Sequence, residues 1–154
     1  MADQRFQEQE IRFMELMQQI DRLYEDYAKA KGMTYMSMSV LEAIYEHQQG
    51  CTQKLICQET HYPKQNVNLI VKSFLLDGYV VLQELPADRR NKQIALTEKG
   101  RAYAEEMVGK LWQVDADATE ALTASQREEL LKLIAIYAGR YEEGVRRLIA
   151  ESKP

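Results

Sequence analysis

Hydrophobic residues recur at intervals of three and four positions along most of this chain, a spacing that predicts a mainly helical protein. The first stripe predicts a helix over residues 6–30, with Gly32 marking its C-terminal end. A second helix is expected to start near Ser37 or Ser39, because either hydroxyl can cap a helix, and to stop before Gly50.

Two short helices follow in the middle of the chain. Residues 51–52 suggest a very short strand, after which Thr52 can cap a helix over 53–61. The next helix, predicted over 63–77, has Pro63 as its first residue, where the missing N–H of proline costs nothing. Two helices joined by so short a turn are typical of a helix-turn-helix.

The hydrophobic spacing then switches to two, which predicts a hairpin. Strands are expected at 80–82 and 94–96, joined by a loop over 86–91 that contains the adjacent Arg89 and Arg90. A helix-turn-helix beside a basic hairpin suggests a DNA-binding winged helix.

The helix predicted over 63–77 has two different faces. Its apolar face is marked by Val67, Ile70, Val71 and Phe74. Its polar face carries Lys64, Gln65, Asn66, Asn68 and Lys72. Amide side chains can pair with adenine, and lysines suit phosphates, so this face is predicted to bind double-stranded DNA. A merely solvated helix face is the alternative reading.

Two long amphipathic helices are predicted over 98–122 and 125–150. Thr97 is a suitable N-cap for the first, and Thr123 with Gln126 fits a capping box for the second. Long apolar stripes at both ends of a small domain have little to pack on within one chain. A symmetric homodimer is therefore expected.

Composition limits the classes of function. At 154 residues and 45% hydrophobic content the chain is expected to form one globular domain. It has no apolar run long enough to span a membrane, a polar N-terminus without a signal sequence, and two cysteines, so a cytoplasmic protein is expected. The net charge is −4, yet residues 51–100 hold seven basic against five acidic side chains. Without a phosphate-binding glycine loop or a nucleophile elbow, neither an enzyme nor a cofactor is expected.

Short motifs in the centre of the chain match a known family. The sequence DRR at 88–90 is followed, after a short strand, by LTEKG at 96–100, and both come after the helix-turn-helix. Residues 52–53, 63–68 and 78–80 add to the match. With these motifs the chain resembles the MarR (multiple-antibiotic-resistance regulator) family from about Tyr27 to the last helix.

The resemblance implies a bacterial transcription regulator with a mostly α fold and a small β-wing. Residues 1–154 would form a single MarR-type domain. The winged helix-turn-helix would occupy about 35–97, flanked by dimerisation helices over about 5–32 and 98–150. Such proteins are two-fold dimers that typically repress transcription and are released by a small molecule or an oxidant.

The resemblance also implies roles for individual residues. The helix over 63–77 would enter the major groove. In the wing, Asp88 would brace the turn while Arg89 or Arg90 reaches the DNA. Gln53 and Pro63 lie in the matching segments and complete the expected DNA-binding set.

Other readings stay open. A winged helix can serve only to bind a protein partner. Two histidines and two cysteines lie close together in sequence and suggest a metal-responsive regulator, although their spacing matches no familiar zinc motif: His47, Cys51, Cys57 and His61. An effector pocket is suggested by a group of aromatic and methionine residues, for which core packing is the alternative: Tyr24, Tyr27, Met33, Tyr35 and Met38.

Overall fold

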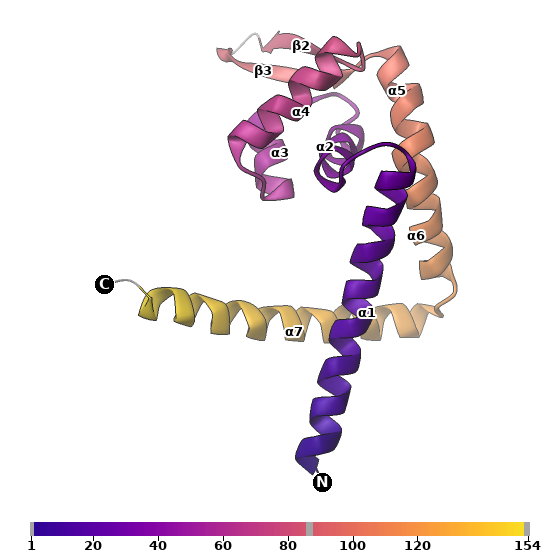
Figure 1. Cartoon of the computed structure of the whole chain (residues 1–154), viewed down its shortest axis with the longest axis vertical. Helices are drawn as coiled ribbons and strands as arrows, with labels where there is room; N and C mark the ends of the chain where they lie inside the picture. The colour runs from indigo at the N-terminus through magenta and orange to yellow at the C-terminus, as the bar shows by residue number, and fades with distance from the viewer. Residues whose placement is uncertain (1, 86–87, 153–154) are drawn as a thin grey trace. The chain divides into compact units, whose positions relative to one another are not determined.

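The computed structural model describes residues 2–85 and 88–152, with side chains at 4–84 and 92–152. It consists of two compact units, Met1–Lys110 and Leu111–Pro154. In chain order the first unit contains α1 (Ala2–Ala30), α2 (Tyr35–Glu46), β1 (Cys51–Thr52), α3 (Gln53–Thr60), α4 (Lys64–Leu76), β2 (Val80–Leu85), β3 (Asp88–Leu96), α5 (Glu98–Ala104) and the π-helix η1 (Glu105–Gly109) (Figure 1). The predicted mostly α fold with a small sheet is confirmed.

Threonines set the starts of the two short helices α2 and α3. The Thr34 hydroxyl accepts a hydrogen bond from the Ser37 N–H at 3.0 Å and caps α2. The prediction that Ser37 or Ser39 caps this helix is therefore wrong, because Thr34 already has the extended backbone of an N-cap and satisfies an exposed N–H. Thr52 caps α3 as predicted, accepting from the Leu55 N–H at 3.2 Å.

Helix α2 is the centre of the first unit and contacts α1, α3, α4, α5, η1 and β3. Apolar side chains from the surrounding elements close over it, which removes them from water and provides the main stabilisation of this unit. The largest fully buried side chains are Met38, Val40, Leu41, Ile44, Ile56, Val67, Val80, Ile94 and Val108.

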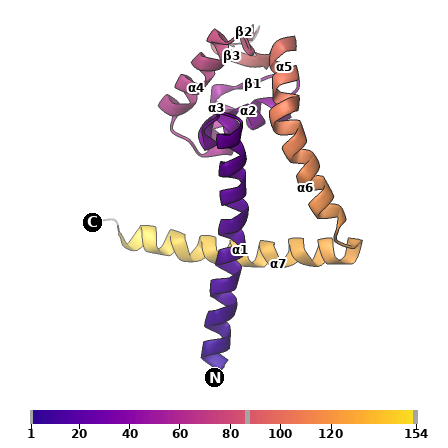
Figure 2. The same cartoon turned by 45° about the vertical axis from the view of Figure 1, so that its right-hand side comes forward.

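A three-stranded antiparallel sheet completes this unit, with the strand order β1-β3-β2 (Figure 2). Cys51 lies opposite Ile94, and Val80 lies opposite Leu96. The Gln93 side-chain amide donates to the Gln49 carbonyl at 2.7 Å and so ties β3 to the loop before β1. This bond and the pairing with β1 hold the β3 side of the hairpin, whereas β2 forms the edge of the sheet.

Helix α5 begins in close contact with the start of the wing. Thr97 caps α5 as predicted, accepting from the Gly100 N–H at 2.9 Å while donating to the Gly78 carbonyl at 2.7 Å. A Cβ atom at Gly100 would lie 1.7 Å from the Tyr79 carbonyl oxygen, so only glycine permits this approach. The Tyr79 ring stacks on Tyr103, with 4.1 Å between the ring centroids.

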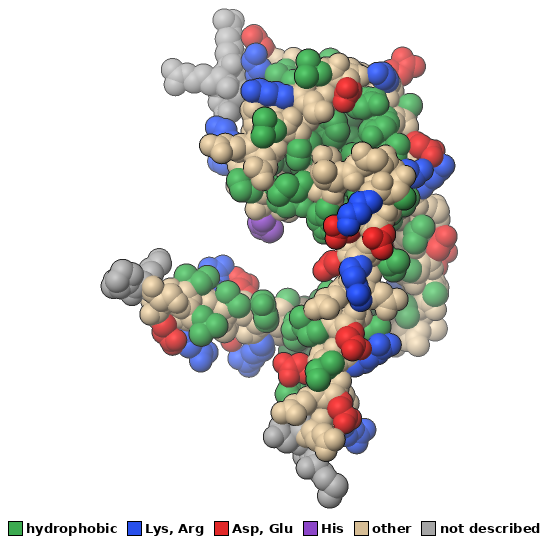
Figure 3. Space-filling model, in the orientation of Figure 1, with side chains coloured by type: hydrophobic (Ala, Val, Ile, Leu, Met, Phe, Trp, Pro, Cys, Tyr) green, Lys and Arg blue, Asp and Glu red, His purple; other side chains and the backbone are tan. Residues whose placement is uncertain are grey.

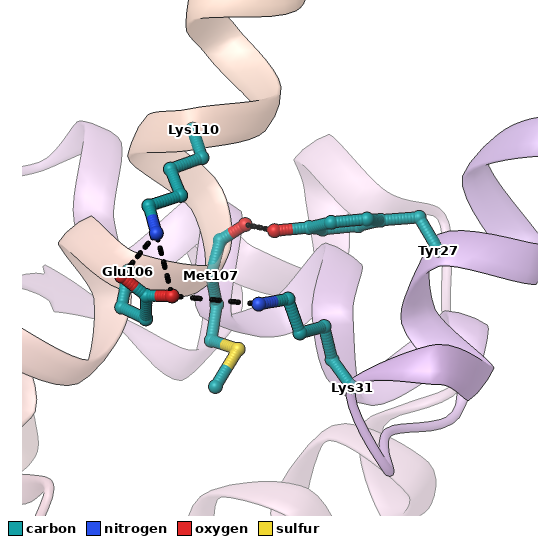
Figure 4. Close-up of polar contacts among 5 residues, drawn as sticks. All are labelled: Tyr27, Lys31, Glu106, Met107 and Lys110. Atoms are coloured by element: carbon teal, nitrogen blue, oxygen red, sulfur yellow. Dashed lines mark hydrogen bonds and ion pairs between the residues drawn. The ribbon is translucent and has the colours of Figure 1, made fainter.

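The stretch predicted as one helix over 98–122 is divided, because the π-helix η1 separates α5 from α6 (Lys110–Glu120). The end of α1 is attached at this π-turn (Figure 4). The Tyr27 hydroxyl donates to the Met107 carbonyl at 2.8 Å, and Glu106 lies 3.4 Å from Lys31 and 2.7 Å from Lys110. The hydrogen bond from Lys110 lowers the pKa of Glu106. Hydrophobic spacing alone does not distinguish α from π turns, so this change could not be predicted from the spacing.

The second unit contains nearly all of α6, followed by α7 (Ala124–Glu151). The predicted capping box is confirmed: Thr123 Oγ1 accepts from the Gln126 N–H, and Gln126 Oε1 accepts from the Thr123 N–H. Apolar side chains lie exposed along α7: Leu130, Ile134, Tyr137, Tyr141 and Leu148. The same is true of α1: Phe6, Met14, Met17, Ile20 and Leu23. Figure 3 shows hydrophobic side chains interspersed with charged ones along this helix. Within residues 2–85 and 88–152, no helix has the length and apolar character required to cross a membrane.

Candidate nucleic-acid interface

The turn between α3 and α4 is tight and held by side chains. His61 adopts a left-handed backbone with φ of +56°, which reverses the chain after α3. Thr60 donates to the Ile56 carbonyl at 2.7 Å and accepts from the Tyr62 N–H at 3.3 Å. The Tyr62 hydroxyl donates to Ser39 on α2 at 3.3 Å. These bonds fix the angle at which α4 leaves the turn.

Helix α4 starts one residue later than predicted. Pro63 is its N-cap rather than its first helical residue, because its ψ of 140° keeps the backbone extended. The Pro63 carbonyl accepts from the Asn66 N–H at 3.0 Å, and no side chain caps the helix. The side chain of Gln53 instead holds this end, donating from Nε2 to the Lys64 carbonyl at 2.9 Å. Its Oε1 accepts from Asn68 Nδ2 at 3.5 Å.

The two faces of α4 are separated as the spacing predicts. Val67, Val71 and Phe74 are buried against the rest of the first unit, whereas Ile70, predicted on the same face, is half-buried. The exposed face presents Lys64, Gln65 and Lys72, with Asn66 and Asn68 half-buried at its margins. Because water reaches these polar groups, they are available to a ligand.

A groove of about 580 Å³ lies between α3, α4 and the wing. Lys54, Lys64, Lys72 and Lys92 line it, together with Gln53 and Asn68, while its floor is apolar. Within the described residues no carboxylate lines the groove. The local field is therefore positive, although the whole chain carries a charge of −4.

Sequence reasoning missed two of these lysines. Lys54 sits in the first turn of α3, and Lys92 lies on β3, opposite Glu84. Neither lies on the polar face of α4 or within the segments that match the family, from which the candidates were taken. The signal that would have found them is the packing of α3 and β3 beside α4, which is a tertiary property.

The predicted wing tip has only its backbone partly described. Residues 88–90 belong to β3, whereas residues 86 and 87 lie outside the described residues. The side chains of Asp88, Arg89 and Arg90 also lie outside the described part of the chain. Their assigned roles in bracing the turn and contacting DNA stay predictions.

The histidines and cysteines do not come together as a metal site. His47 Nε2 lies 2.8 Å from the Glu59 carboxylate, and Cys51 is buried on β1, opposite Ile94 of β3. Burial raises the pKa of Cys51 to about 12, which keeps its thiol protonated. Among the described residues, no three His, Cys, Asp or Glu side chains are arranged to hold a metal ion.

The proposed effector residues are distributed between core and surface. Met38 is fully buried and Met33 nearly so. Tyr24 and Tyr35 are neighbours, with 4.9 Å between ring centroids, and the Tyr24 hydroxyl donates to Glu42 at 2.9 Å. Tyr35 lines a cavity of about 310 Å³ formed by α2, the end of α3 and the turn before α4. The Tyr27 hydroxyl donates to the Met107 carbonyl in the π-helix η1.

Comparison with known proteins agrees with this geometry. A family model described as "MarR family" matches residues 31–91. The chain is 30% identical over 96 residues to the HTH-type transcriptional regulator YwhA of Bacillus subtilis, spanning 62% of this chain and 68% of YwhA.

Solved structures show the same fold. NMB1585, a MarR family regulator from Neisseria meningitidis, superimposes with a TM-score of 0.72 at 23% identity, covering 94% of this chain and 99% of NMB1585. MepR of S. aureus in complex with DNA gives a TM-score of 0.64 at 17% identity, covering 84% and 94% of the two chains. The fold and these similarities define a winged helix-turn-helix protein of the class of transcription regulators. The chain belongs to the MarR family of transcription regulators.

Proposed function

We propose that this protein is a cytoplasmic, homodimeric transcription regulator that binds a pseudo-palindromic operator in double-stranded DNA. The observation that carries the proposal is the groove rimmed by four lysines beside the exposed polar face of α4. The lysines suit the phosphate backbone, which supplies affinity without sequence information. The amides of Gln65, Asn66 and Asn68 suit base edges in the major groove.

The exposed apolar side chains of α1 and α7 support the dimer. Ile20 of α1 is 63% exposed and Tyr141 of α7 is 64% exposed in the single chain. Rows of such residues on long helices are stabilised when a second copy removes them from water. Two-fold symmetry would then present two α4 helices to successive major grooves, about one helical turn of DNA apart.

Regulation by a small-molecule effector is the second part of the proposal, with repression as its sign. The cavity at Tyr35 supports an effector site, because it connects α2 with the turn that orients α4. A ligand there would shift the population of dimers away from the form that fits DNA.

Selection of bound fragments from genomic DNA, followed by salt titration, tests DNA binding. Affinity should fall steeply with salt, with a log–log slope of about 0.9 per neutralised phosphate. Lys72→Ala should lower the magnitude of that slope by about 0.9, the contribution of one phosphate. Lys132→Ala removes the same charge from an exposed position on α7 and serves as the matched control.

The rival function is a winged helix that binds only a protein partner. An intact dimer that binds no genomic fragment at low salt would support this rival and refute the operator-binding proposal. Equal effects of Lys72→Ala and Lys132→Ala would show that binding depends on overall charge rather than on the α4 face.

A further inference from the structure

The beginning of α4 is held by a side chain from the neighbouring helix. Gln53 of α3 donates from Nε2 to the Lys64 carbonyl at 2.9 Å, and its Oε1 accepts from Asn68 Nδ2 at 3.5 Å. Both Gln53 and Asn68 are half-buried in the wall of the lysine-rimmed groove. One amide therefore spans the first turn of the helix that lacks a side-chain cap.

The first bond determines the orientation of both amides. A backbone carbonyl can only accept, so the Gln53 amide must present its NH₂ group to Lys64. The Gln53 side-chain oxygen then faces Asn68, which must donate an N–H to it. Reversing the Asn68 amide would place two oxygens against each other. Reversing Gln53 as well would only move this clash to the Lys64 carbonyl.

We propose that Gln53 is a positioning residue that fixes the Asn68 amide for reading adenine and rejecting guanine. This inference rests on the proposed function. With one N–H bound to Gln53, Asn68 keeps one N–H and its carbonyl oxygen, a pair that matches N7 and the N6 amino group of adenine. Guanine presents two acceptors, N7 and O6, so the fixed oxygen of Asn68 would oppose O6.

An amide that is free to turn would lose this discrimination, because it could direct its NH₂ group at guanine. The predicted effect of Gln53 is thus limited to one base position in each half-site. A residue that only supported the helix would instead change affinity for every sequence alike. This difference separates positioning from a purely structural role.

The experiment measures the affinity of the full-length protein for its selected operator with each base substituted in turn. Asn68→Ala first identifies the position that Asn68 reads, which should prefer adenine over guanine by about tenfold in the wild type. Gln53→Leu should bring the ratio of affinities for adenine and guanine at this position close to one. The base preferences at other positions and the salt slope should stay unchanged. Gln53→Glu keeps an acceptor for Asn68 and should retain part of the preference. Gln58→Leu, the same change at an exposed position on α3, is the control.

The double variant Gln53→Leu/Asn68→Ala should lose no more discrimination between adenine and guanine than Asn68→Ala alone. A uniform loss of affinity in Gln53→Leu, with the adenine preference kept, would overturn the inference, as would a position that prefers another base. The side-chain ¹⁵NH₂ signals of Asn68 in the free protein test the hydrogen bond without DNA. They should shift in Gln53→Leu and stay unchanged in Gln58→Leu. An unshifted signal would overturn the inference even if DNA binds, whereas absence of any DNA binding by the wild type would refute the proposed function itself.

Discussion

Replacing Gly100 by alanine should severely destabilise the first unit. Gly100 is buried at the start of α5, directly against the backbone that leads into the wing. An added Cβ would lie 1.7 Å from the Tyr79 carbonyl oxygen and 2.6 Å from its carbonyl carbon. These are backbone atoms, so no side-chain rotation can relieve the clash, and α5 must move away from Tyr79.

The magnitude follows from what that movement breaks. The Tyr79 carbonyl accepts from the Thr97 N–H at 2.9 Å. The single proton of the Thr97 hydroxyl is shared between the Gly78 carbonyl at 2.7 Å and the Tyr79 carbonyl at 3.2 Å. Each such hydrogen bond contributes about 1 kcal/mol, and overpacking of a well-packed site costs about 1–3 kcal/mol. A loss of about 3–5 kcal/mol in the free energy of unfolding is therefore expected. This is a large share of the roughly 5–15 kcal/mol typical of a whole domain.

Urea denaturation followed by circular dichroism measures this loss. The matched control is Gly139→Ala, because a Cβ at Gly139 meets nothing within 4 Å and the residue lies in the interior of α7. Helix propensity predicts that the free energy of unfolding of the control rises by about 0.5–1 kcal/mol. If Gly100→Ala changed stability by under about 1 kcal/mol, the close approach of α5 to Tyr79 would not be the constraint described.

Two further predictions concern a helix cap and the thiols. Thr123→Ala removes the hydroxyl that accepts from the Gln126 N–H, while the backbone N–H of residue 123 can still donate to Gln126 Oε1. The change should cost about 1 kcal/mol of unfolding free energy, and unchanged urea unfolding would show that the hydroxyl contributes nothing to stability. At pH 8, iodoacetamide should alkylate half-buried Cys57 well before Cys51, because burial raises the pKa of Cys51 to about 12 and keeps it protonated. Mass spectrometry of Cys57→Ser should show little labelling, and rapid labelling of Cys51 would contradict its burial.

Local interactions were predictable from the sequence by itself. Thr52, Thr97 and Thr123 act as helix caps as expected, since a cap depends on residues within one turn of the helix. The hydrophobic spacing likewise identified the buried face of α4, because periodicity depends only on the geometry of the element. The family resemblance was visible for the same reason, as its motifs are short and contiguous.

Contacts between elements were decided only by the tertiary structure. Lys54 and Lys92 join the groove because α3 and β3 pack beside α4, although 37 intervening residues separate them in sequence. Gln53 on α3 donates to the Lys64 carbonyl in the first turn of α4, a bond between two helices. The π-turn beside Tyr27 follows no spacing rule. Hydrogen bonds and packing across elements depend on distances that residue order does not encode locally, so these features required the folded chain.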